Sequence, residues 1–250
     1  MPAPDWIRQF EWHIKNNLTF SLPVFKTPVG LAQIIVDLSP EQIQQLDKLK
    51  SKYDISVWGN VCTQREWLEN LYILDICDRY IGNNNTEIAL DIGSKNWSYL
   101  PALTAFTSNP WHGVELDAYR RYWNLSTRKA YAAYMMKNCS QCKYFSGSLT
   151  GLHGQYSLIT WFLPFVKPEP LRYWGLPDHY FEPEKLLNHA WQLLAPGGIM
   201  FIMNQGQEEA EIQNRLLDTE NLETQFLGEI TSQFNPYKQP RFGWLVTKPL

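Results

Sequence analysis

The sequence predicts an α/β fold in which a doubly wound, mainly parallel sheet carries helices on both faces. Short apolar runs at 87–93, 111–117 and 156–166 are typical of buried strands, and helical patterns separate them. A Pro-Gly-Gly turn at 196–198 ends one such helix and precedes another apolar run. Strands that alternate with helices indicate parallel pairing, and right-handed crossovers then place helices on both faces of the sheet.

The chain is expected to have two parts. Residues 1–63 form a mixed, partly helical N-terminal extension, and residues 64–250 form the α/β domain. Within the extension, Ser39 is a helix cap followed by proline, so a short helix is expected there. At the start of the domain, Thr63 caps an amphipathic helix that ends at Gly82.

The remaining elements alternate along the domain. An Asn-rich turn is expected at 83–85, and Pro101 is expected in the first turn of its helix. The basic residues 120–122 and Lys129 are expected on the solvated face of a long helix rather than in an anion site. The expected strands are 87–93, 111–117, 143–148, 156–166, 199–206, 223–231 and 241–249, and the expected helices are 97–106, 118–138, 183–198 and 208–219.

Composition narrows the functional classes. The 250 residues carry a formal net charge of -3, which argues against broad binding to nucleic acid or anionic lipid. No apolar run is long enough to span a membrane and the N-terminus lacks a signal-peptide pattern, so a cytoplasmic protein is expected. Aromatic residues make up 14% of the chain, which indicates a flat or apolar ligand surface as well as a core. The sequence leaves the oligomeric state open.

The four cysteines do not form a metal site by spacing. Cys139 and Cys142 form a single Cys-Ser-Gln-Cys pair, whereas Cys62 and Cys77 stand apart. A structural zinc site needs a second pair or suitably spaced histidines, and the sequence has neither. Ordinary free thiols are therefore expected, with no metal and no redox role, and this agrees with a cytoplasmic location.

Chemistry-bearing residues follow the predicted strands in order. In doubly wound sheets the ligand lies beyond the carboxyl ends of the strands. An acid 24 positions after Asp91, Glu115, is placed to accept the hydroxyl protons of a ribose, although Asp91 could simply cap a helix and Glu115 could be a surface acid. The residues after the five strands are Asp91 and Gly93; Glu115; Gly147 and Ser148; Trp161, Phe162 and Pro164; and Asn204 and Gln205.

Four segments together resemble the class I S-adenosylmethionine-dependent methyltransferase family: "ALDIG", "GVELD", "FSGSL" and "HAWQLLAPGGIMFIMN". The resemblance covers about residues 64 to 250 and implies a Rossmann-like sheet with an antiparallel C-terminal strand pair. It implies S-adenosylmethionine as cofactor and an N-terminal extension that shapes the substrate pocket. The implied roles are the loop under the methionine end for Asp91 and Gly93, the ribose for Glu115, the adenine for Ser148, and the methyl group for Trp161 and Phe162.

The first loop departs from the family pattern. Lys95 and Trp97 stand where the family usually has its second and third glycines, and Ser148 stands where an acid often meets the adenine amine. Either a side chain crowds the methionine end, or the loop bows away and Lys95 pairs with the methionine carboxylate. A nicotinamide-binding domain is a rival interpretation, but it requires Gly-x-Gly-x-x-Gly and this turn retains only Gly93.

A small molecule is the expected methyl acceptor. The segment 162–165 lacks the polar residue that family members acting on amide or base nitrogens carry there. The long segment 166–185 is expected to cover the site, with Tyr173, Trp174 and Tyr180 facing the substrate, unless it is only a stiff surface loop. Candidate general bases are Asp178 with His179, and His153, whereas His112 lies within a strand and is expected to be structural.

Two functions follow from these features. The favoured one is methyl transfer from S-adenosylmethionine to a small, apolar or aromatic molecule. The alternative is a non-catalytic protein that keeps the fold and uses its aromatic cleft for a ligand or protein partner, and Lys95, Trp97 and Ser148 favour that alternative.

Overall fold

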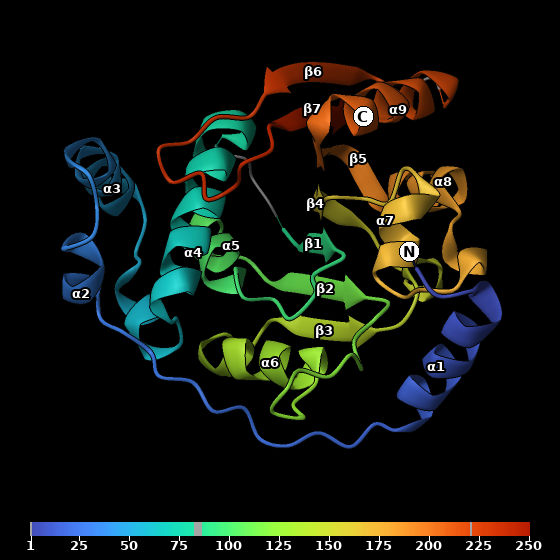
Figure 1. Ribbon diagram of the computed structural model, residues 1–250. Helices are drawn as coiled ribbons and strands as arrows, with labels where there is room; N and C mark the ends of the chain where they lie inside the picture. Colours follow the sequence, from blue (N-terminus) through green and yellow to red (C-terminus); the bar gives the residue numbers. More distant parts are fainter. Residues whose placement is uncertain (1, 83–86, 221) are drawn as a thin grey trace.

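A computed structural model describes residues 2–82, 87–220 and 222–250, and at its centre is one seven-stranded sheet (Figure 1). The strand order is β3-β2-β1-β4-β5-β7-β6. The first five strands pair in parallel, whereas β7 is antiparallel to both β5 and β6. This confirms the predicted α/β sheet with an antiparallel C-terminal strand. The strands are β1 Ala89–Ile92, β2 Trp111–Glu115, β3 Lys143–Ser146, β4 Tyr156–Phe162, β5 Leu194–Gln205, β6 Thr224–Glu229 and β7 Arg241–Thr247.

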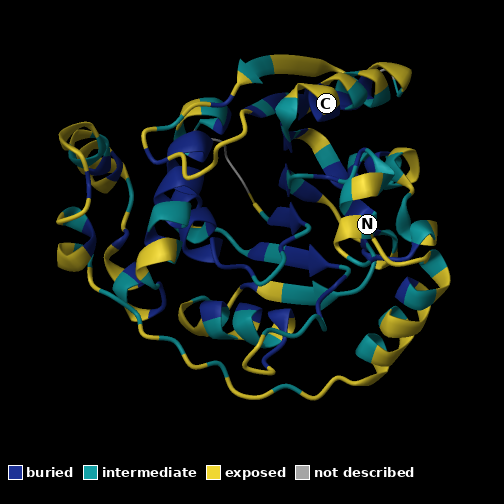
Figure 2. Cartoon of the chain, in the orientation of Figure 1, coloured by how far each residue is buried: buried dark blue, intermediate teal, exposed yellow. Residues whose placement is uncertain are grey.

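Helices cover both faces of the sheet, as predicted, because successive strand residues point to opposite sides. One apolar core lies between the sheet and α3 to α6, and the other lies between the sheet and α8 and α9. The strands in the middle of the sheet are correspondingly buried (Figure 2). The helices are α1 Asp5–Asn17, α2 Leu31–Ile35, α3 Pro40–Lys52, α4 Gln64–Ile76, α5 Leu100–Phe106, α6 Arg128–Met135, α7 Pro168–Tyr173, α8 Pro183–Leu193 and α9 Gly206–Thr219.

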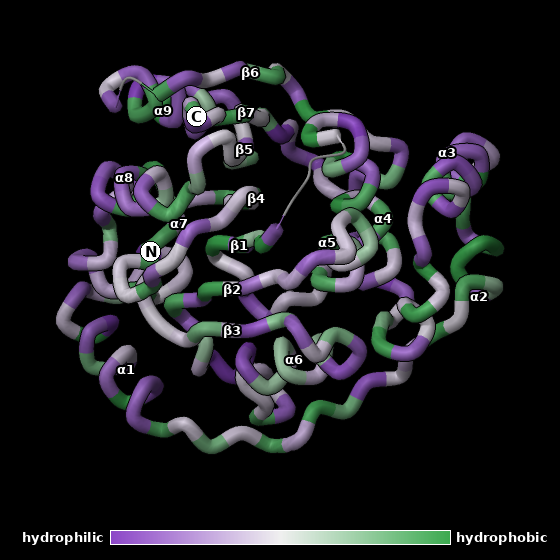
Figure 3. The backbone as a smooth tube through the Cα atoms, turned by 180° about the vertical axis from the view of Figure 1, so that it is seen from behind, coloured by the Kyte–Doolittle hydropathy of each residue, from purple (hydrophilic) through white to green (hydrophobic). Residues whose placement is uncertain are grey.

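The N-terminal 63 residues place their helices at two separate sites on the domain. Ile34, Leu46 and Trp58, in and after α2 and α3, are buried in the core that also contains α4. By contrast, α1 lies on the far side of the molecule, near α7, and the extended segment 18–30 joins the two places by passing below α6 (Figures 1 and 3). The segment is held there, since the Leu22 N–H donates to the Leu125 carbonyl.

The expected helix caps are present. Thr63 precedes α4, and its N–H and hydroxyl both donate to the Glu66 carboxylate, at 2.8 and 2.9 Å. Pro101 lies in the first turn of α5, where its missing N–H breaks no hydrogen bond. Gly82 ends the α4 region with a φ of 70°. The turn expected at 83–85 lies outside the described residues.

The long helix expected over 118–138 is wrong for its first half. Residues 118–127 form an irregular loop, and α6 begins only at Arg128. Thr127 caps α6 by accepting a hydrogen bond from the Ala130 N–H, and Leu125 has a φ of 58°, which no right-handed helix allows. An isolated bridge between Arg121 and Thr127 closes the loop on itself. Arg120 and Arg121 therefore lie in this loop and not on a solvated helix face, where they were expected.

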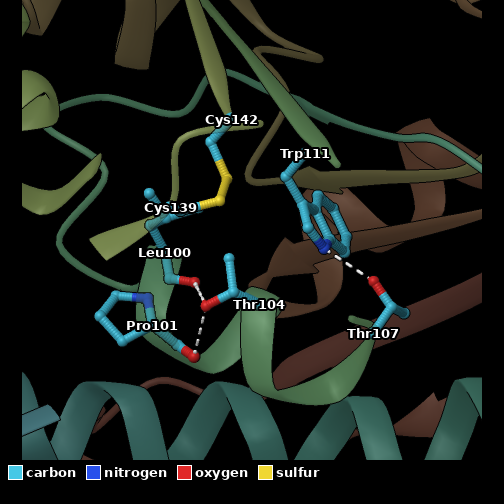
Figure 4. The surroundings of a disulfide bond; sticks show 7 residues. All are labelled: Leu100, Pro101, Thr104, Thr107, Trp111, Cys139 and Cys142. Carbon is cyan, nitrogen blue, oxygen red and sulfur yellow. Dashed lines mark hydrogen bonds between the residues drawn. A yellow bond between two sulfur atoms is a disulfide. The ribbon is translucent and has the colours of Figure 1, made fainter. Parts of the chain in front are cut away.

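The expectation of four free thiols is also wrong. Cys139 and Cys142 form a disulfide, because the turn between α6 and β3 brings their Cα atoms to 5.5 Å (Figure 4). Cys62 and Cys77 are buried free thiols. The disulfide removes the argument from free cysteines for a cytoplasmic location. Among the described residues, no helix is both long and apolar enough to cross a membrane.

Candidate functional site

A cavity of about 350 Å³ lies at the carboxyl ends of the parallel strands, where the strand order reverses. It has the size of a small-molecule site. Eight of the residues predicted for the site line it, so the sheet brings them together in one place. They are Gly93, Lys95, Glu115, Ser148, Trp161, Phe162, Trp174 and Tyr180. The lining also contains Gly147, Pro164 and Gln205, which the sequence placed after strands, and unpredicted residues such as Asp117, Arg128, Leu171 and Glu209.

The first loop keeps a glycine-like backbone at all three glycine positions of the family pattern. Gly93 has a φ of 72°, Lys95 of 50° and Trp97 of 53°. Only glycine enters this left-handed region freely, and another residue costs about 1–2 kcal/mol there. The backbone therefore follows the path of a glycine-rich loop although two of its three glycines are replaced.

The replacing side chains leave the loop in opposite directions. Trp97 is fully buried, and its ring packs so tightly on Gly113 of β2 that an added Cβ there would lie 2.8 Å from Trp97 Cζ2. Trp97 lines no part of the cavity, whereas Lys95 does, with its Nζ 5.5 Å from the centre of the Trp174 ring. The indole thus does not crowd the cavity, and the loop does not bow away from it.

Asp91 faces the opposite side of the sheet and does not line the cavity. Its carboxylate accepts hydrogen bonds from the Tyr99 hydroxyl at 2.9 Å and the Thr160 hydroxyl at 2.8 Å. Complete burial raises the pKa of Asp91 to about 7, and these two hydrogen bonds oppose the rise. Asp91 therefore links β1 to β4 and to the start of α5.

Glu115, at the end of β2, already has protein partners on both oxygens. Oε2 accepts from the Lys95 N–H at 2.9 Å, and Oε1 accepts from the Asp117 N–H at 2.8 Å and from Arg128 Nη1 at 2.9 Å. A carboxylate offers about four acceptor positions. One position therefore remains for a ligand hydroxyl, rather than the two that the sequence led us to expect.

Ser148 and the last residues of β4 also line the cavity. Ser148 lines the cavity and begins a short 3₁₀ turn, η4 Leu149–Gly151, by accepting from the Thr150 N–H. Trp161 and Phe162 line the cavity from the end of β4. Their neighbour Leu163 has a φ of 59°, so the backbone turns sharply into the segment that follows.

The segment 166–185 forms one wall of the cavity. It folds into α7 and a short turn, η5 Asp178–Tyr180, and contributes Trp174 and Tyr180 to the lining. Tyr173 differs, because it is 85% exposed and absent from the lining. Three cations lie over the Trp174 ring, with distances of 5.1 Å from Arg128, 5.2 Å from Arg120 and 5.5 Å from Lys95.

Helix α1 fastens this wall to the rest of the site. The buried Arg8 donates to the Leu176 carbonyl at 2.9 Å and to Asp178 at 2.6 Å. Trp12 donates from its indole N–H to the Tyr180 hydroxyl at 3.1 Å, and the two rings are 5.0 Å apart. Lys15 pairs with Asp117 beside Glu115. Helix α1 thus links the wall segment to the end of β2.

The candidate bases lie outside the cavity. Asp178 pairs with Arg8 and Arg172, and the ring of His179 lies 4.2 Å from that of Tyr180, so the two neighbours face different partners. His153 is exposed and does not line the cavity. His112 lies in β2 with Nδ1 3.0 Å from the Tyr156 hydroxyl. This arrangement favours structural roles for Asp178, His179 and His112.

Comparison with solved structures identifies the fold. The chain superposes on an S-adenosylmethionine-dependent methyltransferase from Aquifex aeolicus with a TM-score of 0.50 and 12% identity, over 71% of this chain and 92% of the other. The sheet order 3-2-1-4-5-7-6 and the cavity at the strand ends agree with that likeness. The chain has the class I methyltransferase fold. At this identity the likeness is one of fold.

Two further solved structures show weaker likeness to this methyltransferase-like chain. A methyltransferase from Pyrococcus furiosus matches with a TM-score of 0.47 and 17% identity, over 75% of this chain and all of the other. Phosphoethanolamine N-methyltransferase 2 from Haemonchus contortus, in complex with S-adenosyl-L-methionine, matches with a TM-score of 0.48 and 13% identity, over 74% of this chain and 53% of its own. This chain thus spans about half the length of the Haemonchus protein. No family model and no curated protein sequence matches it.

Proposed function

We propose that the protein binds S-adenosylmethionine in the cavity at the strand ends and transfers its methyl group to a small molecule. The observation that carries this proposal is the first loop, which keeps positive φ at Gly93, Lys95 and Trp97 and so the shape of a glycine-rich cofactor loop. Neither substituted side chain forces the loop away from this path. A backbone that tolerates this strain at two positions points to a functional constraint on its shape.

The cavity residues supply the contacts that such a cofactor needs. Gly93 allows close approach of the backbone, and Glu115 keeps one acceptor position for a ribose hydroxyl. Ser148 and Leu149 would face the adenine, and Trp161 and Phe162 would exclude water near the reacting carbon. When bound, the cofactor supplies an electrophilic methyl group on a sulfonium.

The acceptor would enter between β4 and the wall formed by 166–185. Of the predicted substrate residues, Trp174 and Tyr180 line the cavity, which supports this role for them, whereas Tyr173 faces solvent. No imidazole of the described residues lines the cavity. An acceptor that is already nucleophilic would need mainly alignment, whereas one that must first lose a proton would need a carboxylate of the lining, such as Glu209, as its base.

The second candidate function is that of a non-catalytic ligand-binding protein. The observation that favours it is the pairing of Arg128 with Glu115 at 2.9 Å, because the guanidinium occupies an acceptor position that a ribose hydroxyl would otherwise use. A protein of this kind would bind a ligand in the cavity without recognising S-adenosylmethionine.

Titration calorimetry with S-adenosylhomocysteine separates the two functions. The informative variant is Glu115→Gln, which keeps one acceptor oxygen but loses the charge, and the matched control is Glu208→Gln, whose carboxylate is 73% exposed and outside the cavity. A cofactor site predicts binding by the wild type and the control, and binding weakened about tenfold or more in Glu115→Gln. No binding by a folded wild-type protein would contradict the proposed function.

A further inference from the structure

A second, more open cavity of about 550 Å³ lies beside the first and has an unusual charge. Lys95, Arg128 and Trp174 line both cavities, so the two are adjacent. The other lining residues of the second cavity are Asn96, Arg120, Arg121, Tyr122, Trp123 and Leu125. Four of its nine lining residues are therefore cationic and none is acidic, in a chain whose formal net charge is -3.

Two of the four cations have no carboxylate partner among the described residues. Arg121 donates only to backbone carbonyls, those of Leu18 and Phe20. Lys95 has the Trp174 ring beneath its ammonium and no ion pair within the described chain. Burial lowers the pKa of Lys95, and the neighbouring Arg128 lowers it further. A bound anion would reverse that effect.

The other two cations share their carboxylates. Arg120 pairs with Asp117, and Arg128 pairs with Glu115 at 2.9 Å and lies 3.7 Å from Asp117. Asp117 also pairs with Lys15. The five cations Lys15, Lys95, Arg120, Arg121 and Arg128 thus together have two carboxylates, Glu115 and Asp117, as ion-pair partners. The Nε of the buried Arg128 has no hydrogen-bond partner in the described structure. The charge of Glu69 raises the pKa of Lys95, and the charge of Arg241 lowers it.

The protein holds this positive charge in place rather than leaving it on mobile side chains. The Trp174 carbonyl accepts from Arg120, and carbonyls of the 18–30 segment accept from Arg121. Guanidinium groups fixed in this way match the geometry of a phosphate or carboxylate. Beside them, Trp123 is fully exposed at the mouth and offers an apolar face to the body of a ligand.

We propose that the second cavity is an anion site, which binds the phosphate or carboxylate of a small molecule whose flat apolar part packs against Trp123 and Trp174. Because Lys95 and Trp174 also line the first cavity, the anion would belong to the methyl acceptor. That assignment to the acceptor rests on the proposed function, whereas the anion site itself does not.

Titration calorimetry with phenyl phosphate and with benzoate, compared with uncharged phenol, tests the site. The wild type is expected to bind one or both anions and not phenol. Binding should weaken about tenfold in Arg120→Gln, which removes a partly exposed guanidinium, and in Lys95→Gln, which removes the ammonium but keeps a polar side chain. The matched control is Lys129→Gln, an exposed cation of the same region outside both cavities, and it should change affinity less than twofold.

Each outcome separates the anion site from the proposed function. No binding of either anion, equal binding of phenol, or an equal loss in Lys129→Gln would overturn the anion site. Titration of the wild type with S-adenosylhomocysteine in the same experiment tests the methyltransferase proposal alone. Anion binding without S-adenosylhomocysteine binding would leave the anion site standing and contradict only its assignment to a methyl acceptor.

Discussion

Positive φ at a residue with a side chain costs free energy, and the first loop has two such residues within three positions, Lys95 and Trp97. The cost is accepted because each residue has a second role. Trp97 fills the space above Gly113 in the core, and Lys95 donates its N–H to Glu115 and places an ammonium between the two cavities. The loop thus keeps its backbone conformation while the side chains of Lys95 and Trp97 make contacts elsewhere.

Substitution of Lys95 tests the loop geometry directly. We expect Lys95→Gly to be more stable than Lys95→Ala by about 1 kcal/mol, because both variants lose the ammonium and only glycine adopts a φ of 50° without strain. Urea unfolding of the two variants measures the difference. The reverse order, with alanine more stable, would mean that the loop does not hold a left-handed residue at this position.

Asp91 predicts a pH dependence of stability. Its pKa rises from the usual 3.8 to about 7 because it is buried, so the folded protein holds this proton more tightly than the unfolded chain. The resulting stabilisation is complete below about pH 3.8 and is lost as the pH rises to about 7. We expect the stability of the wild type relative to Asp91→Asn to fall across this window.

Urea unfolding at several pH values measures this difference, since the other titrating groups are common to both proteins. Asparagine is nearly isosteric with aspartate and keeps groups that can bond to Tyr99 and Thr160. A stability difference that stays constant between pH 4 and 7 would contradict the raised pKa of Asp91.

At the scale of elements, α1 and the wall segment that contains α7 depend on each other. Neither has a large apolar core of its own, and Trp6 and Phe10 on the outer face of α1 are 70% and 62% exposed. What joins them is polar: Arg8 contacts Leu176 and Asp178, and Trp12 contacts Tyr180. Contacts of this kind hold a segment in place yet allow local opening at low cost.

Removing the guanidinium of Arg8 should loosen this wall. In Arg8→Met we expect chymotrypsin to cleave after Tyr173 several times faster than in the wild type, because cleavage requires local opening of α7. The matched control is Arg172→Met, since Arg172 binds the same Asp178 carboxylate but is 39% exposed and belongs to the wall segment itself. Equal acceleration in both variants would mean that α1 does not fasten the wall.

The elements also show where sequence patterns are insufficient. The strands and α4 were predicted because their apolar spacing and the Thr63 cap are local signals. The helix over 118–138 was predicted too long, because its alternation of basic and aromatic residues suits either a solvated helix or a loop. The loop form is decided by distant contacts, such as that between Leu22 and Leu125, which no local pattern contains.

At the scale of the whole molecule, the sheet order determined which predicted site residues meet. Gly93, Glu115, Ser148 and Trp161 meet because the parallel strands end at one edge, and that much follows from the sequence. Arg128 was missed although it lies 13 positions after Glu115, since nothing in the sequence indicates that a basic residue of a presumed outer face turns inward. The disulfide was missed because a single Cys-x-x-Cys pair has no unique meaning.

The whole-molecule consequence of these positions is a cavity formed by five strand ends and one wall segment, which α1 holds in place. The two carboxylates that join α1 to the end of β2 and to the wall have partners within the chain: Asp117 pairs with Lys15 and Arg120, and Asp178 pairs with Arg8 and Arg172. Binding of a cofactor should therefore stabilise distant segments of the chain together rather than one loop alone.

Hydrogen exchange of the whole protein, with and without S-adenosylhomocysteine, tests the cofactor site most directly. A site at the strand ends predicts slower exchange at 93–98, 115–118, 147–149 and 161–165 in the presence of the ligand, and little change in α3 at the far side of the molecule. Unchanged exchange at all four segments, or protection confined to other parts of the chain, would contradict a cofactor site in this cavity.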